Sequence, residues 1–371
     1  SPQHDNFIIV STIIDTGENE LMKSLLKFLI FSITLTILSA CQPEEQAKIE
    51  WKLQSQAVEN SIDFQQLITF AEDVKVMSNG KFIITPYSAG KLAHGPNIFN
   101  AVKERKVEMG NGWPNWWSGQ HPAWAVMNAG PFDFMNLDAS MMFFLAGEGT
   151  QLANDLSVPE GIIWRPAWWA GMEFGILSRE PIAGLNDLRG KRVRIGPGLP
   201  SEVLTEASGS YSIPLVPEEI RPALESGDID AVEWTTTNGV LGLGINDVSP
   251  YAIVPAIWQP SVLADFLINQ QAYSELPDSF KRILEVAIKS YTLTTTMKAK
   301  VADIQALEQL READTKFSTW SDEDIERWRE ATAKITEQYK SKDAYTKQLI
   351  EKKQSFKNEY NSYYEMFGPY E

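Results

Sequence analysis

The sequence predicts an α/β fold, because strand-like and helix-like segments alternate along much of its 371 residues. Residues 49–55 alternate apolar and polar side chains as a half-exposed strand does, and residues 62–77 carry apolar side chains at helical spacing. The same alternation returns between residues 187 and 234 and is typical of a largely parallel sheet. From residue 277 onward the pattern is helical only.

The remaining elements follow in the same order along the chain. Asn79-Gly80 is typical of a helix C-terminus, so a new strand is expected directly after it. Pro217 favours the first turn of a helix, and Gly227 separates that helix from the next strand. Further strands are expected at 81–86, 191–195, 212–216, 230–234 and 261–269, and further helices at 97–105, 201–208, 217–226, 277–311 and 321–339.

Composition limits the possible functions. The chain carries 33 Lys and Arg against 49 Asp and Glu, a net charge of −16, and such an acidic surface argues against nucleic-acid binding. A single Cys excludes an internal disulfide and a Cys-based zinc site, and the three His residues form no closely spaced pair. With 43% hydrophobic residues, a chain of this length suits a globular protein of two domains.

The N-terminus is expected to be targeting sequence. Basic residues precede an apolar run at 28–38, the arrangement of a secretory signal peptide at 22–40. The run ends in Leu-Ser-Ala-Cys, which resembles the lipobox of bacterial lipoproteins and predicts lipidation of Cys41; a plain signal peptide is the alternative. Residues 1–21 show no such pattern and are expected to precede the native start, while residues 41–47 form a polar tether.

Tryptophan is concentrated in one part of the chain. Seven of the 12 Trp residues lie between residues 113 and 169, and Trp113, Trp116 and Trp117 fall in a segment bounded by glycines. Such boundaries predict a loop, and aromatic side chains on a loop commonly line a ligand site. The alternative, that these rings belong to the hydrophobic core, stays open.

Two charged positions are also candidates for a binding site. Arg194 ends a predicted strand that runs into Gly-Pro-Gly and a helix N-terminus, where an Arg is well placed to bind a carboxylate. The alternative is that Arg192 and Arg194 are both solvated. The turn lacks the phosphate-binding patterns GxxxxGK(S/T) and GxGxxG. Glu233 lies among apolar residues and needs a partner, which a salt bridge, a cation or acid–base chemistry could supply.

Two runs of sequence carry a family resemblance. Residues 190–195 (GKRVRI) and 220–234 (IRPALESGDIDAVEW) resemble the extracytoplasmic solute-binding proteins of tripartite ATP-independent periplasmic (TRAP) transporters. Residues 110–122 and the turn PAIWQP at 255–260 are similar to the branch that binds 2-oxo acids and lactate together with a metal ion. The resemblance covers nearly the whole chain after the signal peptide.

The resemblance implies a two-lobe, periplasmic-binding-protein-like fold of class II type, with a hinge and no enzymatic activity. Lobe I is expected to comprise residues 48–160 and 235–275, lobe II residues 161–234, and residues 276–371 to form long helices that brace both lobes. The implied function is capture of a small monocarboxylate, such as pyruvate or lactate, and its delivery to membrane subunits. The protein would lie in the periplasm on its lipid anchor, and the long helices could pair two copies in a homodimer.

The resemblance also implies particular site residues. Arg194 would bind the carboxylate of the ligand, while Glu233 and the main-chain carbonyl of Trp234 would coordinate a cation. Glu173 occupies the place where this branch commonly has a Gln ligand. The remaining substrate-binding side chains would be those of Trp113, Asn115, Trp116, Trp117 and Trp258.

The acidic residue at position 173 affects which cation is expected. Glu173, Glu233 and a ligand carboxylate carry three negative charges, which Arg194 balances together with a divalent ion but not with Na⁺. Hard oxygen ligands suit Ca²⁺, so Ca²⁺ is expected in preference to Na⁺. Two alternatives remain: a binding protein of the same architecture for a sugar or sugar acid and, less favoured, a glycoside hydrolase with Glu173 and Glu233 as its acid and base.

Overall fold

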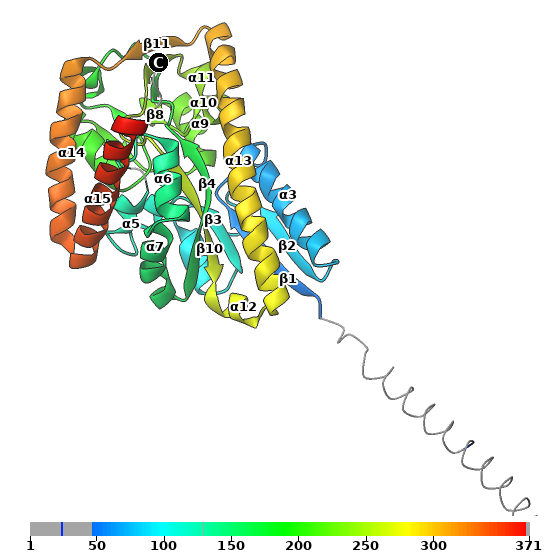
Figure 1. The fold of residues 1–371 in the computed structure, drawn as a ribbon. Coiled ribbons are helices and arrows are strands. Elements are labelled where there is room, and N and C mark those ends of the chain that lie inside the picture. The colour runs from blue at the N-terminus through cyan, green and yellow to red at the C-terminus, as the bar shows by residue number, and fades with distance from the viewer. Residues whose placement is uncertain (1–23, 25–46, 129, 369–371) are drawn as a thin grey trace, which may run out of the picture. The chain divides into compact units, whose positions relative to one another are not determined.

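The computed structural model describes residues 24, 47–128 and 130–368 (Figure 1). The expected upstream segment, the signal peptide apart from residue 24, and the lipidation site Cys41 lie outside the described residues. The chain divides after residue 48, and every element named below belongs to the unit formed by residues 49–371. In the described part, no helix is both long and apolar enough to cross a membrane.

The first sheet has five strands in the order β2-β1-β3-β10-β4 (Figure 1). Its three N-terminal strands are parallel to one another, whereas β10 runs antiparallel to both β3 and β4. The helices α3 and α4 follow β1 and β2, as the alternation predicted, and Ser61 caps α3 by accepting the backbone N–H of Phe64. The bounds are β1 (Ile49–Ser55), α3 (Ile62–Met77), β2 (Phe82–Tyr87), α4 (Asn97–Lys103), β3 (Met109–Gly112), β4 (Ile162–Gly171) and β10 (Val262–Asn269).

The second sheet has six strands in the order β11-β9-β5-β8-β6-β7. The parallel neighbours are β6 with β7, β6 with β8, and β9 with β11, while β5 runs antiparallel to β8 and β9. The predicted strand–helix alternation after residue 187 is confirmed. The bounds are β5 (Ile176–Ser178), β6 (Arg192–Arg194), α8 (Leu199–Ser208), β7 (Tyr211–Ile213), α9 (Pro217–Ser226), β8 (Ala231–Glu233), β9 (Tyr251–Val254) and β11 (Lys316–Thr319).

The distribution of strands between the sheets differs from the expected lobe boundaries at three places. β4 was expected in lobe II but pairs with β10 in the first sheet, β9 was expected in lobe I but pairs with β5, and β11 lies in a region predicted to be helical only. Strand partners are chosen by tertiary contacts that a local pattern does not contain. The assignment of residues to lobes therefore remains a proposal, and its boundaries fit best at the first crossover (residues 172–175) and the second crossover (residues 255–261) between the sheets.

The C-terminal helices pack against β4 of the first sheet and against helices that follow strands of both sheets. α13 is a continuous helix of 35 residues that packs against α3 and β4 (Figure 1). α14 packs against α8, and α15 packs against α5 and α6. The remaining bounds are α5 (Trp124–Met127), α6 (Leu137–Leu145), α7 (Gly149–Ser157), α10 (Thr237–Gly242), α11 (Ile245–Val248), α12 (Gln270–Glu275), α13 (Asp278–Glu312), α14 (Asp322–Lys342) and α15 (Ala344–Phe367).

An acidic side chain lies in the core of the first sheet. Asp265 on β10 is fully buried, and its Oδ2 accepts hydrogen bonds from Nε1 of Trp117 at 2.8 Å and from Nε1 of Trp164 at 2.7 Å. Burial raises the pKa of Asp265 to about 7, although the two indole donors act in the opposite direction. The folded state therefore holds a proton on Asp265 at pH values where the unfolded chain has released it.

This raised pKa predicts a pH-dependent stability. Because the pKa of Asp265 is higher in the folded state than its unfolded value of 3.8, stability is greatest below that value and falls as pH rises to about 7. We expect the free energy of unfolding without ligand to decrease by about 4 kcal/mol over this window. Urea unfolding between pH 4 and 8 measures it. Asp265→Asn should remove this part of the slope and leave the part due to Glu173 and Asp63, whose pKa values burial also raises, and an unchanged slope in that variant would contradict the assignment.

Candidate functional site

A small cavity lies where the two crossovers meet the second sheet. Its volume is about 20 Å³, on a measure by which one water molecule needs about 10–15 Å³. Polar side chains contribute much of its lining. The lining residues are Trp113, Asn115, Trp116, Glu173, Arg194, Gly196, Glu233, Trp234, Thr235, Gln259 and Val262.

Main-chain hydrogen bonds join the segments that carry these residues. The N–H of Glu173, in the first crossover, donates to the carbonyl of Gln259 in the second crossover at 3.2 Å. The next residue, Phe174, donates to the carbonyl of Thr235 at 2.7 Å, which attaches the segment after β8. Gly175 permits this approach, because it has a φ of +149° and a Cβ there would lie 2.1 Å from a main-chain oxygen of β9. The positions of Glu173 and Gln259 are thus fixed by the backbone.

A buried ion pair forms the centre of the cavity. Arg194 ends β6 and Glu233 ends the parallel neighbour β8, so the two side chains meet at the carboxyl edge of the sheet, and each is 3% exposed. Arg194 Nη1 donates to the carbonyl of Glu233 at 2.7 Å and to its Oε2 at 3.2 Å, and Nε donates to the carbonyl of Leu215 at 3.0 Å. The guanidinium also lies 4.8 Å from the ring centre of Trp234. Burial lowers the pKa of Arg194, and the two nearby carboxylates oppose that shift.

Two buried oxygen acceptors at the cavity have no donor among the described residues: Glu173 Oε2 and Gln259 Oε1. Burial raises the pKa of Glu173 well above its usual range, and the negative charge of Glu233 adds to that increase. The positive charges of Arg194 and Lys300 act in the opposite direction. Buried acceptors without donors require an explanation, and a bound cation is one that satisfies both.

The chemistry of these donors fits a hard cation. Carboxylate and amide oxygens are the ligands that Ca²⁺ and similar ions take in proteins. Among the described residues, no group of three or more His, Cys, Asp and Glu side chains could hold a metal ion. A cation at Glu173 and Glu233 would therefore need further oxygens, which Gln259, main-chain carbonyls and a bound ligand can provide.

Most of the predicted site residues line this one cavity, but two do not. Trp117 is buried and uses its N–H to bind Asp265, and Trp258 is fully buried and stacks on Trp328 with ring centres 4.9 Å apart. Both rings are part of the core, so Trp117 and Trp258 do not line the cavity as was expected. The predicted residues that do line the cavity are Trp113, Asn115, Trp116, Glu173, Arg194, Glu233 and Trp234.

The sequence analysis missed Gln259, Thr235, Gly196 and Val262, which also line the cavity. Gln259 follows Trp258 within the turn at 255–260 that carried the resemblance. Its polar side chain, between Trp258 and Pro260, was the feature from which a site residue could have been predicted. Of the other three, Gly196 donates its main-chain N–H to Oε2 of Glu233 at 3.4 Å, and nothing in the residue types of Thr235 and Val262 distinguishes them.

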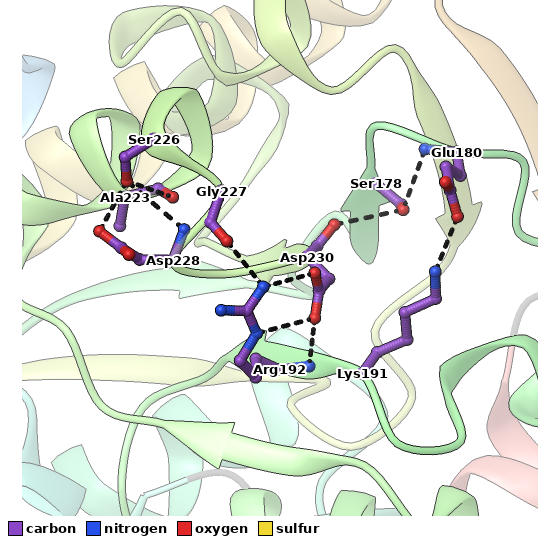
Figure 2. A network of polar contacts seen from close by, with 9 residues as sticks. All are labelled: Ser178, Glu180, Lys191, Arg192, Ala223, Ser226, Gly227, Asp228 and Asp230. Carbon is purple, nitrogen blue, oxygen red and sulfur yellow. Dashed lines mark hydrogen bonds and ion pairs between the residues drawn. The ribbon is translucent and has the colours of Figure 1, made fainter.

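Arg192, two residues before Arg194, has a structural role instead. Its Nε and Nη2 bind the two carboxylate oxygens of Asp230 at 3.1 and 2.8 Å, and Nη2 also donates to the carbonyl of Gly227 (Figure 2). These contacts join β6 to the start of β8. The pair Arg192–Asp230 therefore holds together the two strands whose ends present Arg194 and Glu233.

Comparison with known proteins shows the family. Residues 53–343 match the family of bacterial extracellular solute-binding proteins, family 7 (DctP). A monocarboxylate 2-oxoacid-binding periplasmic protein of Nostoc sp. is 29% identical over 311 residues, which are 84% of this chain and 85% of that protein.

Two solved structures of TRAP periplasmic solute-binding proteins have the same fold. The protein of Pseudoalteromonas atlantica, with bound sodium and pyruvate, and that of Colwellia psychrerythraea, with bound calcium and pyruvate, are each 26% identical to this chain. The matches cover 85% of this chain and 96% of each of theirs, with TM-scores of 0.81 and 0.80. Since these similarities span both sheets and the residues of the cavity, the chain belongs to the family of TRAP transporter solute-binding proteins, whose members bind solutes for transport and are not enzymes.

Proposed function

We propose that this protein captures a small monocarboxylate with a 2-oxo or 2-hydroxyl group, such as pyruvate or lactate, together with a cation, and delivers it to TRAP membrane subunits. The main support is the buried grouping of Arg194, Glu233 and Glu173 around one cavity, together with an oxygen of Gln259 that has no donor among the described residues. The name of the Nostoc relative and the pyruvate in two similar structures favour the same ligand class.

In this proposal, Arg194 exchanges its bond to Glu233 for bonds to the carboxylate of the ligand. Glu233, once released, would hold the cation together with Glu173, the main-chain carbonyl of Trp234 and Gln259. The cation would supply positive charge for the carboxylate and the 2-oxo or 2-hydroxyl oxygen of the ligand. Trp113 and Trp116 would exclude water from this polar centre, which strengthens each electrostatic contact.

We propose Ca²⁺ rather than Na⁺ as the cation. Gln259 is neutral, so the site would gather the charges of Glu173, Glu233 and one ligand carboxylate against Arg194. A divalent ion makes the set neutral, whereas Na⁺ leaves a buried negative charge. The two relatives with pyruvate hold sodium in one case and calcium in the other, so the preference is argued from the charges of this chain.

A thermal-shift screen of the chain from residue 42 tests the proposed function. Pyruvate, lactate, other 2-oxo acids and sugar acids would each be tested with Ca²⁺, with Na⁺ and with EDTA. A ligand that binds only the folded state raises the melting temperature. We expect an increase with short 2-oxo or 2-hydroxy acids that EDTA removes. An increase with sugar acids alone, or one that is indifferent to metal, would overturn the proposed ligand and cation.

Asn115 provides a further test, because it connects the two sides of the cavity. Its Nδ2 donates to the carbonyl of Pro197, after β6, at 2.8 Å, while Asn115 itself lies in η1 (Pro114–Trp117), after β3. Asn115→Ala should weaken pyruvate binding about 10-fold, since one partly buried hydrogen bond between the two sides is lost. Calorimetric titration measures this. Gln120→Ala is the control. It removes an exposed hydrogen bond from the side-chain amide of Gln120 to Asn100, and it should bind pyruvate as the unchanged protein does.

Two proposals concern location and assembly. The lipobox resemblance supports lipid anchoring through Cys41, which mass spectrometry of the membrane fraction would test.

A homodimer through α13 is supported by a stripe of exposed apolar side chains on this helix, in which Ile304 is 71% exposed. Light scattering would measure the mass, and Ile304→Lys should shift it to that of one chain. The other members of the stripe are Val286, Leu293, Met297 and Val301.

A further inference from the structure

A second cavity adjoins the first one. Its volume is about 110 Å³, and its walls come from the segment between β1 and α3, from Trp168 on β4 and from α10. Trp113, Trp234 and Thr235 line both cavities. The second cavity is therefore the space next to the proposed carboxylate and cation site, separated from it by these side chains.

Two indole rings form most of this partition. Trp113 packs against Trp168, a residue of the second cavity, with ring centres 5.9 Å apart. Trp234 packs against the guanidinium of Arg194, in the first cavity, at 4.8 Å. Because Trp113 and Trp234 line both cavities, the chain of a ligand held by Arg194 would have to pass these rings to enter the second cavity.

The walls of the second cavity show what kind of chain it suits. Trp168 is 7% exposed, and its Nε1 has no hydrogen-bond partner among the described residues. A buried N–H without an acceptor raises the free energy of the folded state, so a hydrogen-bond acceptor on a bound ligand would stabilise the protein at this wall. Asp63, also 7% exposed, lines the same cavity, and a second carboxylate on the ligand would have to be buried beside this acidic side chain. Apolar side chains such as Val58 and Leu243 complete the lining.

We propose that the second cavity binds the distal part of the ligand, a neutral chain that carries a hydrogen-bond acceptor. A cavity of about 150 Å³ holds benzene, so about 110 Å³ suits a chain of roughly three to five non-hydrogen atoms. This inference rests on the proposed function and narrows it: the preferred ligand is a 2-oxo or 2-hydroxy monocarboxylate longer than pyruvate or lactate, and dicarboxylates are disfavoured.

Calorimetric titration of the whole protein with Ca²⁺ and four 2-oxo acids tests the proposal. The acids are pyruvate, 2-oxoheptanoate, its ether isostere 5-methoxy-2-oxopentanoate, and 2-oxoglutarate. We expect both longer monocarboxylates to bind at least 10-fold more tightly than pyruvate, since each buried methylene contributes. The ether should bind about fivefold more tightly than its alkyl isostere, because it accepts the Trp168 N–H. 2-Oxoglutarate should bind more weakly than either.

Two variants test the walls separately. Trp168→Phe keeps a ring but removes the N–H, so the fivefold preference for the ether over the alkyl chain should disappear. Trp328→Phe is the matched control, because Trp328 Nε1 is also buried without a partner among the described residues but lines neither cavity. It should keep the preference. Leu243→Phe fills the cavity and should lower the affinity for both longer acids about 10-fold relative to pyruvate.

The outcomes separate the two proposals. If pyruvate binds more tightly than both longer acids, or if Trp168→Phe leaves the ratio between ether and alkyl ligand unchanged, the second cavity is not a ligand subsite, while monocarboxylate binding stands. If none of the four acids binds with any cation, the proposed function itself fails.

Discussion

Arg194→Met is expected to lower the affinity for pyruvate by at least 100-fold. The change removes the guanidinium that would bind the ligand carboxylate, and a charge-assisted, two-pronged contact of this kind is among the strongest in proteins. It also leaves Glu233 buried without its ionic partner, so the free energy of unfolding should fall by about 3–5 kcal/mol. Calorimetric titration and urea unfolding measure the two effects separately.

Two further variants distinguish lost binding from lost folding. In the double variant Arg194→Met with Glu233→Gln, the buried charge is removed together with its partner, so stability should recover while binding stays lost. Arg165→Met is the control, because Arg165 also forms an ion pair, with Glu285 at 2.8 Å, but neither residue lines the cavity. It should change the affinity less than twofold. Pyruvate binding of normal strength in Arg194→Met would contradict the assignment of the carboxylate site.

Glu173→Gln is expected to remove most of the dependence on Ca²⁺. In the unchanged protein, dialysis against a chelator should weaken pyruvate binding on the order of 100-fold, whereas in the variant the remaining charges balance with Na⁺ and the loss should be less than about 10-fold. Because burial raises the pKa of Glu173, its ionised form destabilises the folded chain above the unfolded pKa. Without ligand, the variant should therefore melt at a higher temperature at neutral pH.

The double variant Glu173→Gln with Gln259→Glu is the control for the cation experiment. It moves the carboxylate to the other crossover but keeps the total charge around the cavity, because both residues line it. Dependence on Ca²⁺ should return if charge decides the cation, and should stay lost if Glu173 is needed for its position. If the unchanged protein binds pyruvate equally well in Na⁺ alone after chelation, the preference for Ca²⁺ is wrong.

The sequence predicted that Arg194 and Glu233 each end a strand, and only the family resemblance assigned both to one site. They meet because β6 and β8 are neighbouring parallel strands whose carboxyl ends share one edge. The sequence was not sufficient to orient the aromatic residues. Trp116 and Trp117 are consecutive, yet one lines the cavity and the other binds Asp265, which is 148 residues further along the chain. That choice depends on a tertiary contact, and local spacing carries no information about it.

The pairing of β4 and the existence of β11 could not be predicted from the sequence for a related reason. β11 has four residues, most of them exposed, and it becomes a strand by pairing with β9. β4 is almost entirely buried, and its residue types would suit either sheet. Its pairing with β10 places it in the first sheet. Propensity and periodicity therefore identified the elements that have a clear local sequence pattern. They missed the strands that form only by pairing with a strand distant in the sequence.

The location of Glu173 and Gln259 on the two crossovers bears on the order in which the cation and the carboxylate bind. If the two sheets rotate about the crossovers, groups on them move least, whereas the outer contact between His94 and Glu218, at 3.2 Å, would separate widely. The oxygens of Glu173 and Gln259 would stay close together in an open molecule, so in the proposed function a cation could bind them first, and the carboxylate would then release Glu233 from Arg194 to complete the site. Such a receptor responds only when both solutes are present, and thus detects their coincidence rather than the concentration of either one.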